Sequence, residues 1–247
     1  MSQVTLNALN NNLIFDIGMH VGQDTRFYLE KGFKVVAVEA NPVLACEARR
    51  TFKDYIDRGQ LTIVAKGIAS GGSTSIPFFV NNLHSEWSSF IEDIGSRGGS
   101  YETIYVEVTS VPFLFKQHGC PYYLKIDIEG LDYDLLKSLH DVHTLPRYIS
   151  AENGQEHMIR ELVSLGYKSF KFINQAHIGG RHSIIPSKEG ISVDIIFDHG
   201  ASGEFGEDTP GEWMTMEAVI EVSNRYWSNP KIDANKDGWY DIHARIF

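Results

Sequence analysis

The sequence predicts an α/β fold in which helices cover both faces of a mostly parallel sheet. Short apolar runs, partly β-branched and ended by glycine or polar residues, alternate with segments that carry helix-capping signals. This order of strand, helix, strand, helix and strand is typical of a parallel sheet, because crossover helices pack onto its faces. The chain has 247 residues, and one domain with a large core is the simplest account.

The first half of the predicted sheet consists of three buried strands separated by two helices. The strands are the apolar runs Leu13 to Ile17, Phe33 to Val38 and Leu61 to Ala65. The first helix spans Thr25 to Lys31, and Asp24 is its candidate N-cap. The second helix begins at Asn41-Pro42, an N-cap followed by a proline at the first helical position, and runs to about Arg58.

The rest of the chain continues the alternation. Further strands are expected at Ser75 to Val80, Tyr105 to Thr109, Tyr122 to Ile128, Tyr148 to Ala151, Tyr167 to Ile173 and Val193 to Phe197. Helices are expected at Asp132 to Leu139, His157 to Leu165 and Met214 to Tyr226. Long polar loops remain at Asn81 to Ser100, Asn174 to Gly190 and His199 to Gly211, and we interpret the first as a mobile loop or lid.

The domain organisation follows from this alternation. We find no repeat or linker, so we expect one domain over residues 1–247. Its core spans about residues 13–197, and a C-terminal extension, residues 198–247, packs on it. Within the extension, Asp233 to Gly238 resembles the start of a calcium-binding loop, but Ala244 stands where the bidentate Glu belongs. We therefore expect a turn there.

Composition excludes several functional classes. The net charge is −10 and no dense Lys/Arg run occurs, which argues against nucleic-acid binding. No apolar run approaches about 18 residues, so we expect no membrane span. The polar N-terminus lacks the pattern of a signal peptide, and Cys46 and Cys120 form no C-x-x-C pair. We therefore expect a cytoplasmic protein, and self-association stays open.

A nucleotide-type site is predicted where the first strand ends in Asp16-Ile17-Gly18-Met19-His20-Val21-Gly22. Gly18 and Gly22 let the backbone approach a ligand closely, and His20 lies between them. The dinucleotide pattern G-x-G-x-x-G places glycine where this chain has Asp16. An acid there suits a ligand with a positive group better than a pyrophosphate. S-adenosylmethionine has an amino group and a sulfonium.

The next two strand ends extend this site. Glu39 follows the second strand at the spacing expected of an acid that binds ribose hydroxyls, and Ala40 and Asn41 come directly after it. Small and apolar groups at Gly67 and Ile68, after the third strand, suit an adenine ring. The alternative is a tight turn beside a solvated carboxylate. Because all these features occur in order, nucleotide binding is the stronger interpretation.

Charged residues at the next strand ends predict a second part of the site. Lys125, Asp127 and Glu129 alternate along one strand and so project to the same side, and Glu152 and Asn153 end the following strand. Charges in a buried strand are costly unless they are paired. Ligands bind at the carboxyl ends of such strands, so these residues are catalytic candidates. The alternative is an ion pair between Lys125 and Asp127 that only orients the strand.

At these residues the chain resembles the FkbM-type family of S-adenosylmethionine-dependent methyltransferases. The matching segments are FDIGMHVGQDT, VVAVEANP, YLKIDIEGLDYDLL and YISAEN, with a weaker match at SGEFGEDTPGEW. The resemblance implies a Rossmann-like class I methyltransferase fold, with seven strands and an antiparallel last strand. It also implies O-methylation of sugar or natural-product hydroxyls. The family's second acid after the KIDIEG run has its nearest counterpart in Asp132, one position beyond the common spacing.

We therefore expect an O-methyltransferase that methylates a hydroxyl of a sugar, glycan precursor or natural-product-like small molecule. Asp127 and Glu152 are candidates for general base or metal ligand, Glu129 is a second choice, and Lys125 orients the reacting groups. The candidate cofactor-binding residues are Asp16, Gly18, His20, Gly22, Glu39, Ala40, Asn41, Gly67, Ile68 and Asp127. Mg²⁺ is a candidate second cofactor, because Asp127, Glu152 and Asn153 offer oxygen ligands. The alternatives are a nicotinamide-dependent oxidoreductase and a non-catalytic nucleotide-binding scaffold.

Overall fold

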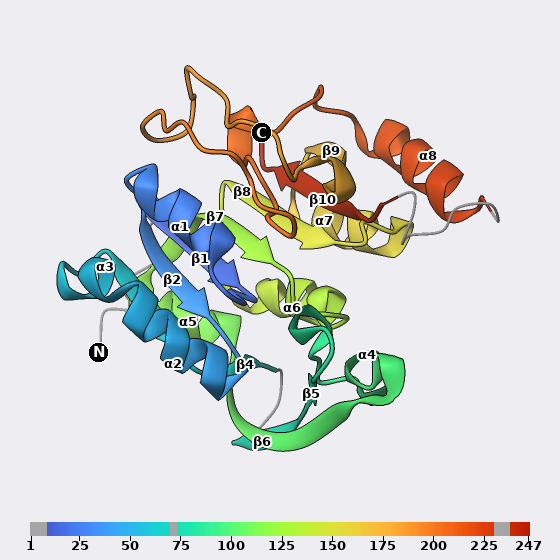
Figure 1. Cartoon of the computed structure of the whole chain (residues 1–247). Coiled ribbons are helices and arrows are strands. Elements are labelled where there is room, and N and C mark those ends of the chain that lie inside the picture. Colours follow the sequence, from blue (N-terminus) through green and yellow to red (C-terminus); the bar gives the residue numbers. More distant parts are fainter. Residues whose placement is uncertain (1–8, 70–73, 230–237) are drawn as a thin grey trace, which may run out of the picture.

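A seven-stranded sheet forms the centre of the molecule (Figure 1). The computed structural model describes residues 9–69, 74–229 and 238–247. The strand order is β3-β2-β1-β7-β8-β10-β9, and β10 runs antiparallel to both of its neighbours. The strands are β1 (Leu9–Ile17), β2 (Lys34–Val38), β3 (Leu61–Val64), β7 (Cys120–Ile126), β8 (Tyr148–Glu152), β9 (Ser169–Asn174) and β10 (Tyr240–Arg245).

Helices cover both faces of this sheet. The α-helices are α1 (Gln23–Glu30), α2 (Pro42–Thr51), α3 (Lys53–Asp57), α4 (Glu92–Gly95), α5 (Val111–His118), α6 (Asp132–Ser138), α7 (Glu156–Leu165) and α8 (Met216–Trp227). The short 3₁₀ turns are η1 (Ser85–Trp87), η2 (Arg97–Gly99), η3 (Leu139–Asp141), η4 (Gln175–His177) and η5 (Gly206–Asp208). The predicted α/β class and the seven-stranded sheet are confirmed.

The alternation of side chains along each strand divides the core in two. Leu13, Phe15 and Ile17 of β1 pack in one cluster with apolar residues of α5, α6, α7 and α8. Ile14 of the same strand packs on the other face with α1, α2 and the segment that includes Phe205. Because both faces of β1 are buried from residue 13 to residue 17, this part of the strand appears in the sequence as an apolar run interrupted only by Asp16.

A smaller three-stranded sheet lies beyond the carboxyl end of β3, at the bottom of Figure 1. It consists of β4 (Gly67–Ile68), β5 (Ser75–Asn81) and β6 (Tyr101–Thr109), in the order β4-β6-β5. The predicted loop or lid connects β5 to β6. It contains η1, α4 and η2, and it faces the carboxyl edge of the large sheet.

The strand predicted at Val193 to Phe197 is wrong. Ile196 forms an isolated bridge with His182, whereas Phe197 packs against the face of the sheet instead of joining its edge. The seventh strand is β10, in the stretch predicted to be an extension. Its Ile242 and Ala244 are buried toward α7 and α8, while its alternate residues are charged or polar. We did not predict this strand because polar residues alternate with apolar ones along it, although the polar side chains are buried as well.

Three predicted helix details also differ. Gly22 precedes α1 with left-handed φ, so Asp24 lies inside the helix and is not its N-cap. The helix predicted to run to Arg58 breaks at Phe52, whose φ and ψ are not helical. Helix α5 was not predicted, although Ser110 and a proline in the first turn are N-terminal signals.

The turn predicted at 233–238 lies, apart from Gly238, outside the described residues. Within the described part of the chain, no helix is long and apolar enough to cross a membrane.

Candidate functional site

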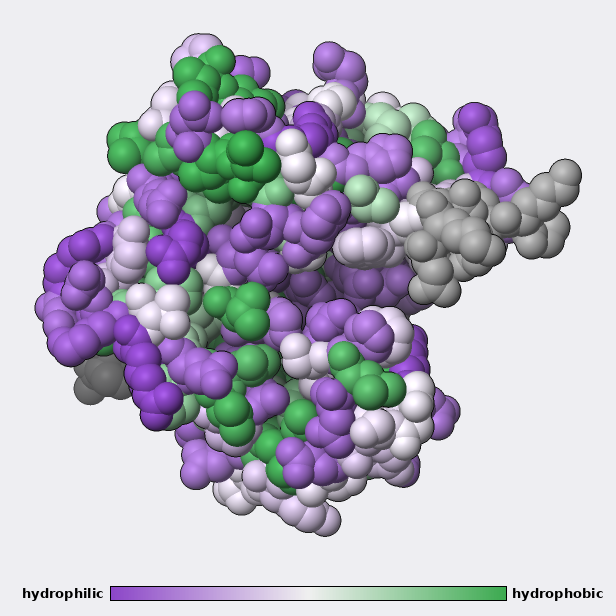
Figure 2. Space-filling view, viewed as in Figure 1, coloured by the Kyte–Doolittle hydropathy of each residue, from purple (hydrophilic) through white to green (hydrophobic). Residues whose placement is uncertain are grey.

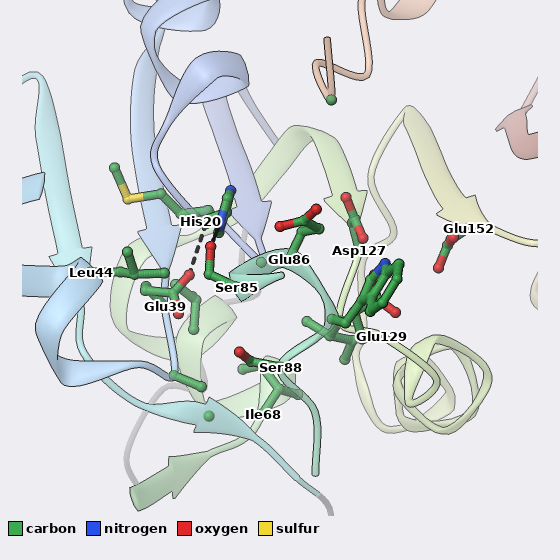
Figure 3. Close-up of a pocket in the computed structure, with 18 of the residues that line it drawn as sticks. His20, Glu39, Leu44, Ile68, Ser85, Glu86, Ser88, Asp127, Glu129 and Glu152 are labelled. Carbon is green, nitrogen blue, oxygen red and sulfur yellow. Dashed lines mark hydrogen bonds between the residues drawn. The ribbon is translucent and has the colours of Figure 1, made fainter. Parts of the chain in front are cut away.

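A pocket of about 660 Å³ opens at the carboxyl edge of the large sheet, where β1, β2, β7 and β8 end (Figures 2 and 3). Between β1 and β7 the chain order of the strands reverses direction, and ligands of parallel sheets bind at such points. The predicted site residues that line it are Gly18, His20, Glu39, Ala40, Gly67, Ile68, Lys125, Asp127, Glu129 and Glu152. Most of the predicted site therefore converges on one cavity.

The predicted residues outside the pocket lining are Asp16, Gly22, Asn41 and Asn153. Asp16 is fully buried beneath the pocket, where Thr25 Oγ1 donates to its Oδ2 at 2.6 Å. Asn41 caps α2 by accepting from the Val43 N–H at 2.9 Å. Asp16 and Asn41 therefore bond to neighbouring residues instead of lining the cavity.

The turn after β1 is held close to two neighbouring strands. The N–H groups of Gly18 and Met19 both donate to the Val38 carbonyl, at 3.1 and 3.0 Å. Gly18 has φ +89°, and a Cβ on it would lie 1.7 Å from the Asp127 carbonyl oxygen. Only glycine allows this approach of β1 to β7. His20 is also left-handed, with φ +51°, although it is not glycine.

Glu39 lies at the end of β2 and accepts two backbone hydrogen bonds. The N–H of His20 donates to Oε2 at 2.8 Å, and the N–H of Asn41 donates to Oε1 at 2.7 Å. Burial raises the pKa of Glu39 to about 7, although these hydrogen bonds oppose the change. A carboxylate has about four acceptor positions, so Glu39 can still accept bonds from a ligand.

Lys125 is the centre of a buried charge network. Its Nζ lies 3.4 Å from Asp16 Oδ1, 3.3 Å from Asp24 Oδ2 and 3.3 Å from Asp127 Oδ2. It also donates to the Gly18 carbonyl at 3.2 Å. Burial by itself lowers the pKa of Lys125, but the carboxylates outweigh it and raise that pKa well above its usual value. The ion pair with Asp127, the alternative interpretation from the sequence, is therefore present within a larger network.

Three carboxylates gather on the side of the pocket opposite Glu39 (Figure 3). Asp127, Glu129 and Glu152 each offer an oxygen, and these oxygens lie within 4.8 Å of one another. Burial raises the pKa of Glu129 to about 8, and the nearby Asp127 adds to this. Burial raises the pKa of Glu152 well above its usual value, again with Asp127 contributing. The three groups form one acidic cluster at the end of β7 and β8.

The predicted metal ligands only partly coincide with this cluster. Asn153 does not line the pocket, and its Nδ2 donates to Glu152 Oε2 at 3.5 Å. Glu129 joins the cluster instead, with φ +49°, a value that costs energy in a non-glycine residue. Strained backbone of this kind gathers at functional sites.

Two further acids lie beside the cluster. Asp132 is 2% exposed, its Oδ1 accepts from the Glu152 N–H at 3.4 Å, and burial raises its pKa to about 7. Asp241 of β10 pairs with Glu152 across the sheet, and burial raises its pKa well above its usual value. The family resemblance already pointed to Asp132, as the nearest counterpart of the second acid after the KIDIEG run. No sequence signal points to Asp241, because β10 was not predicted.

Residues 81–100 form one wall of the pocket. The wall residues that this segment contributes are Ser85, Glu86, Trp87, Ser88, Phe90 and Arg97. Ser85 Oγ and His20 Nε2 are hydrogen bonded at 2.8 Å, as Figure 3 shows. The lining residues that sequence analysis did not predict as site residues also include Leu44, Lys66, His199 and Trp239. Leu44 and Lys66 adjoin predicted site segments, whereas His199 and Trp239 come from parts of the chain that only the fold brings to this edge.

Comparison with known proteins decides the family. The profile of the methyltransferase FkbM domain matches residues 16–169, more than half of the chain. The chain belongs to the FkbM methyltransferase family. It is therefore an S-adenosylmethionine-dependent methyltransferase, and the oxidoreductase alternative is set aside. The match includes the turn after β1, Glu39 and the acidic cluster.

Solved structures with a similar fold are methyltransferases of low sequence identity. Precorrin-6y C5,15-methyltransferase from Geobacter metallireducens is 12% identical with a TM-score of 0.41, over 97% of this chain and 81% of that one. The METTL16 methyltransferase domain is 9% identical with a TM-score of 0.45, over 98% of this chain and 62% of that one. An S-adenosylmethionine-dependent O-methyltransferase from Thermotoga maritima is 10% identical with a TM-score of 0.38, over 97% of this chain and 61% of that one. No curated protein matches the chain.

Proposed function

We propose that this chain transfers a methyl group from S-adenosylmethionine to a hydroxyl of a sugar, glycan precursor or natural-product-like small molecule. The observation that carries the proposal is the acidic cluster Asp127, Glu129 and Glu152, which shares one pocket with Glu39. The pocket therefore has one side suited to the cofactor and another suited to proton removal. Its volume of about 660 Å³ is within the range of small-molecule sites.

The residues present fit S-adenosylmethionine. Glu39, fixed by two backbone donors, is placed to accept from the ribose hydroxyls. Leu44 and Ile68 offer apolar surface for the adenine, beside Gly67 and Ala40. The carboxylates of Asp24 and Asp127 lie near the turn after β1 and favour the positive amino group and sulfonium. Asp16 acts indirectly, through Lys125 and Thr25.

The acceptor needs proton removal and alignment. When bound, S-adenosylmethionine supplies a methyl group on a positively charged sulfur that an acceptor oxygen attacks in line. A sugar hydroxyl is a poor nucleophile at neutral pH, so a base within hydrogen-bond reach must take its proton. A carboxylate of the acidic cluster accepts that proton, and the raised pKa of Glu129, about 8, makes such acceptance favourable. Lys125 holds Asp127 in place at 3.3 Å.

The same cluster suits a hard divalent cation such as Mg²⁺. Its donors are all carboxylate oxygens, and their mutual repulsion favours a positive ion between them. Glu129, Asp127 and Glu152 would hold the ion, which would lower the pKa of the acceptor hydroxyl. The acceptor is a small molecule rather than a nucleic acid, given the acidic chain and cluster. The free thiols of Cys46 and Cys120 are compatible with a cytoplasmic location.

Excess EDTA is expected to lower methyl transfer at least tenfold, and Mg²⁺ or Mn²⁺ is expected to restore it, because the cation activates the hydroxyl. The measurement is release of S-adenosylhomocysteine with a sugar that the protein methylates. Binding of Mn²⁺ alone, followed by its electron paramagnetic resonance signal, should weaken in Glu129→Gln. Unchanged activity in EDTA would remove the cation from the proposal and leave a carboxylate base.

Titration calorimetry with S-adenosylmethionine tests the cofactor side. Burial raises the pKa of Glu39 to about 7, and an ionised carboxylate accepts from ribose hydroxyls better than a neutral one. The dissociation constant should therefore fall about tenfold from pH 6 to pH 8, as the carboxyl group ionises. Glu39→Gln should bind more weakly and lose this pH dependence. Equal pH dependence in both proteins would contradict the assignment of the ribose to Glu39.

A further inference from the structure

His20 connects the two sides of the pocket. Its backbone N–H donates to Glu39 Oε2 at 2.8 Å, and its ring Nε2 is hydrogen bonded to Ser85 Oγ at 2.8 Å (Figure 3). The residue has φ +51°, a conformation that persists in a non-glycine residue only where the surroundings hold it. Its backbone is therefore fixed by the carboxylate that would bind ribose, and its ring is fixed by the 81–100 wall.

The 81–100 wall is cross-linked from within. Asn81 is 2% exposed, and its Oδ1 accepts from the N–H groups of Leu83 and His84, at 2.9 and 2.8 Å. Its Nδ2 donates to the carbonyls of Gly95 and Arg97, at 3.0 and 2.7 Å. One buried amide thus joins both ends of the segment. A change in the position of Ser85 is therefore transmitted to the rest of the wall.

The wall also reaches the acidic cluster. Ser89 Oγ donates to the Glu129 carbonyl at 2.7 Å, which supports the strained turn that places the Glu129 carboxylate. Glu86 and Trp87 line the same cavity from this wall. A contact at Ser85 is thereby connected to the side of the pocket where an acceptor would react.

We propose that His20 is a positioning residue: it couples cofactor binding at Glu39 to the placement of the 81–100 wall over the acceptor side. The inference rests on the proposed function, which places the ribose at Glu39. A ligand that bonds Glu39 stabilises the turn that carries His20, and the imidazole transmits this order to Ser85. Such a ligand favours the arrangement in which the hydrogen bond between His20 and Ser85 is made. The cofactor would then prepare the wall before the acceptor enters.

Hydrogen–deuterium exchange tests this coupling without an acceptor. The full chain is measured with and without saturating S-adenosylmethionine, in the wild type, His20→Asn and Ser85→Ala. Asparagine tolerates the left-handed conformation and keeps the backbone N–H on Glu39, so His20→Asn removes only the ring contact. In the wild type the cofactor should slow exchange in peptides spanning 84–89 by at least about fivefold. In both variants we expect less than twofold slowing there, with peptides spanning 38–42 still protected.

One control variant and three outcomes distinguish the possibilities. Ser100→Ala, a change in the same segment away from His20, is the matched control and should behave as the wild type does. If the cofactor slows exchange at 84–89 in Ser85→Ala and His20→Asn as much as in the wild type, the coupling is overturned, because the cofactor would then order the wall by direct contact. Protection at neither 38–42 nor 84–89 in the wild type would overturn the cofactor assignment, and the coupling with it. In the double variant His20→Asn/Ser85→Ala, effects smaller than the sum of the two single effects would support a shared contact.

Discussion

Replacement of Glu152 by glutamine is expected to lower the rate of methyl transfer by about 10²- to 10⁴-fold, the range of a positioned general base. Burial raises the pKa of Glu152 well above its usual value, which makes its carboxylate a stronger base. Glutamine keeps the shape of the side chain but cannot accept the proton. The fold and the affinity for S-adenosylmethionine should therefore change little, and the loss should appear in kcat.

The measurement is S-adenosylhomocysteine release with a sugar acceptor, alongside calorimetry of cofactor binding. Glu221→Gln, on the exposed face of α8, is the matched control and should retain full activity. Glu129→Gln and Asp127→Asn complete the series across the acidic cluster. A wild-type kcat in Glu152→Gln would indicate that Glu129 or Asp127 is the base instead. A wild-type kcat in all three would contradict the proposed role of the cluster.

Lys125→Met is expected to cause the largest loss of stability. The substitution leaves Asp16, Asp24 and Asp127 without the ammonium group that lies within 3.4 Å of each. Removal of one partner from a buried ion network costs about 3–5 kcal/mol, because the remaining charges stay in a poorly solvated site. In a chain of this size each kcal/mol lowers Tm by about 2–4 °C. A fall of at least about 6 °C is therefore expected near neutral pH.

The pH dependence of this loss gives a second check. Burial raises the pKa of Asp16 in the folded state and Lys125 opposes this change, so the substitution raises that pKa further. The protonated form of Asp16 favours folding, so the variant should lose stability as pH rises and recover part of it toward pH 5. Lys116→Met, at an exposed position of α5, is the matched control. Lys125→Arg should retain most of the stability. An unchanged Tm in Lys125→Met would show that the network contributes little.

Strands with both faces buried were predictable, because their information is local. The runs before Gly18 and Glu39 coincide with β1 and β2 within a few residues. The strand predicted at Tyr122 to Ile128 coincides with β7 within two residues, but β7 ends at Ile126, so Asp127 and Glu129 follow the strand instead of alternating along it. Helix α5 also had local signals, Ser110 and a proline in the first turn, that the prediction did not use.

Two strand assignments failed because apolar periodicity does not specify where a segment packs. Phe197 belongs to an apolar run, but it covers a face of the sheet next to Phe27, at 5.0 Å between ring centroids. Tyr240 to Arg245 contains Asp241 and His243, yet it inserts between β8 and β9. The burial of the polar residues of β10 is explained only by the neighbouring strands, β8 and β9, which lie on either side of it.

The sequence by itself determined the kind of site in this protein. Glycines at the turn after β1, an acid after β2 and acids after β7 and β8 occur at strand ends, and parallel strands bring their carboxyl ends to one edge. The residue type at each position determines which chemistry that position can supply. Glu39 and the KIDIEG run therefore pointed to a nucleotide-type cofactor and to acid–base chemistry without any structure.

Only the tertiary structure decided which of these groups act together. Asp16 turned inward to Lys125, Asn153 stayed outside the pocket, and Glu129 entered the acidic cluster through a left-handed turn. Asp241 and Ser85 reached the site from distant segments. Distances between side chains, and the pKa values that burial shifts, depend on long-range packing. That packing is a property of the whole fold and not of any local stretch of sequence.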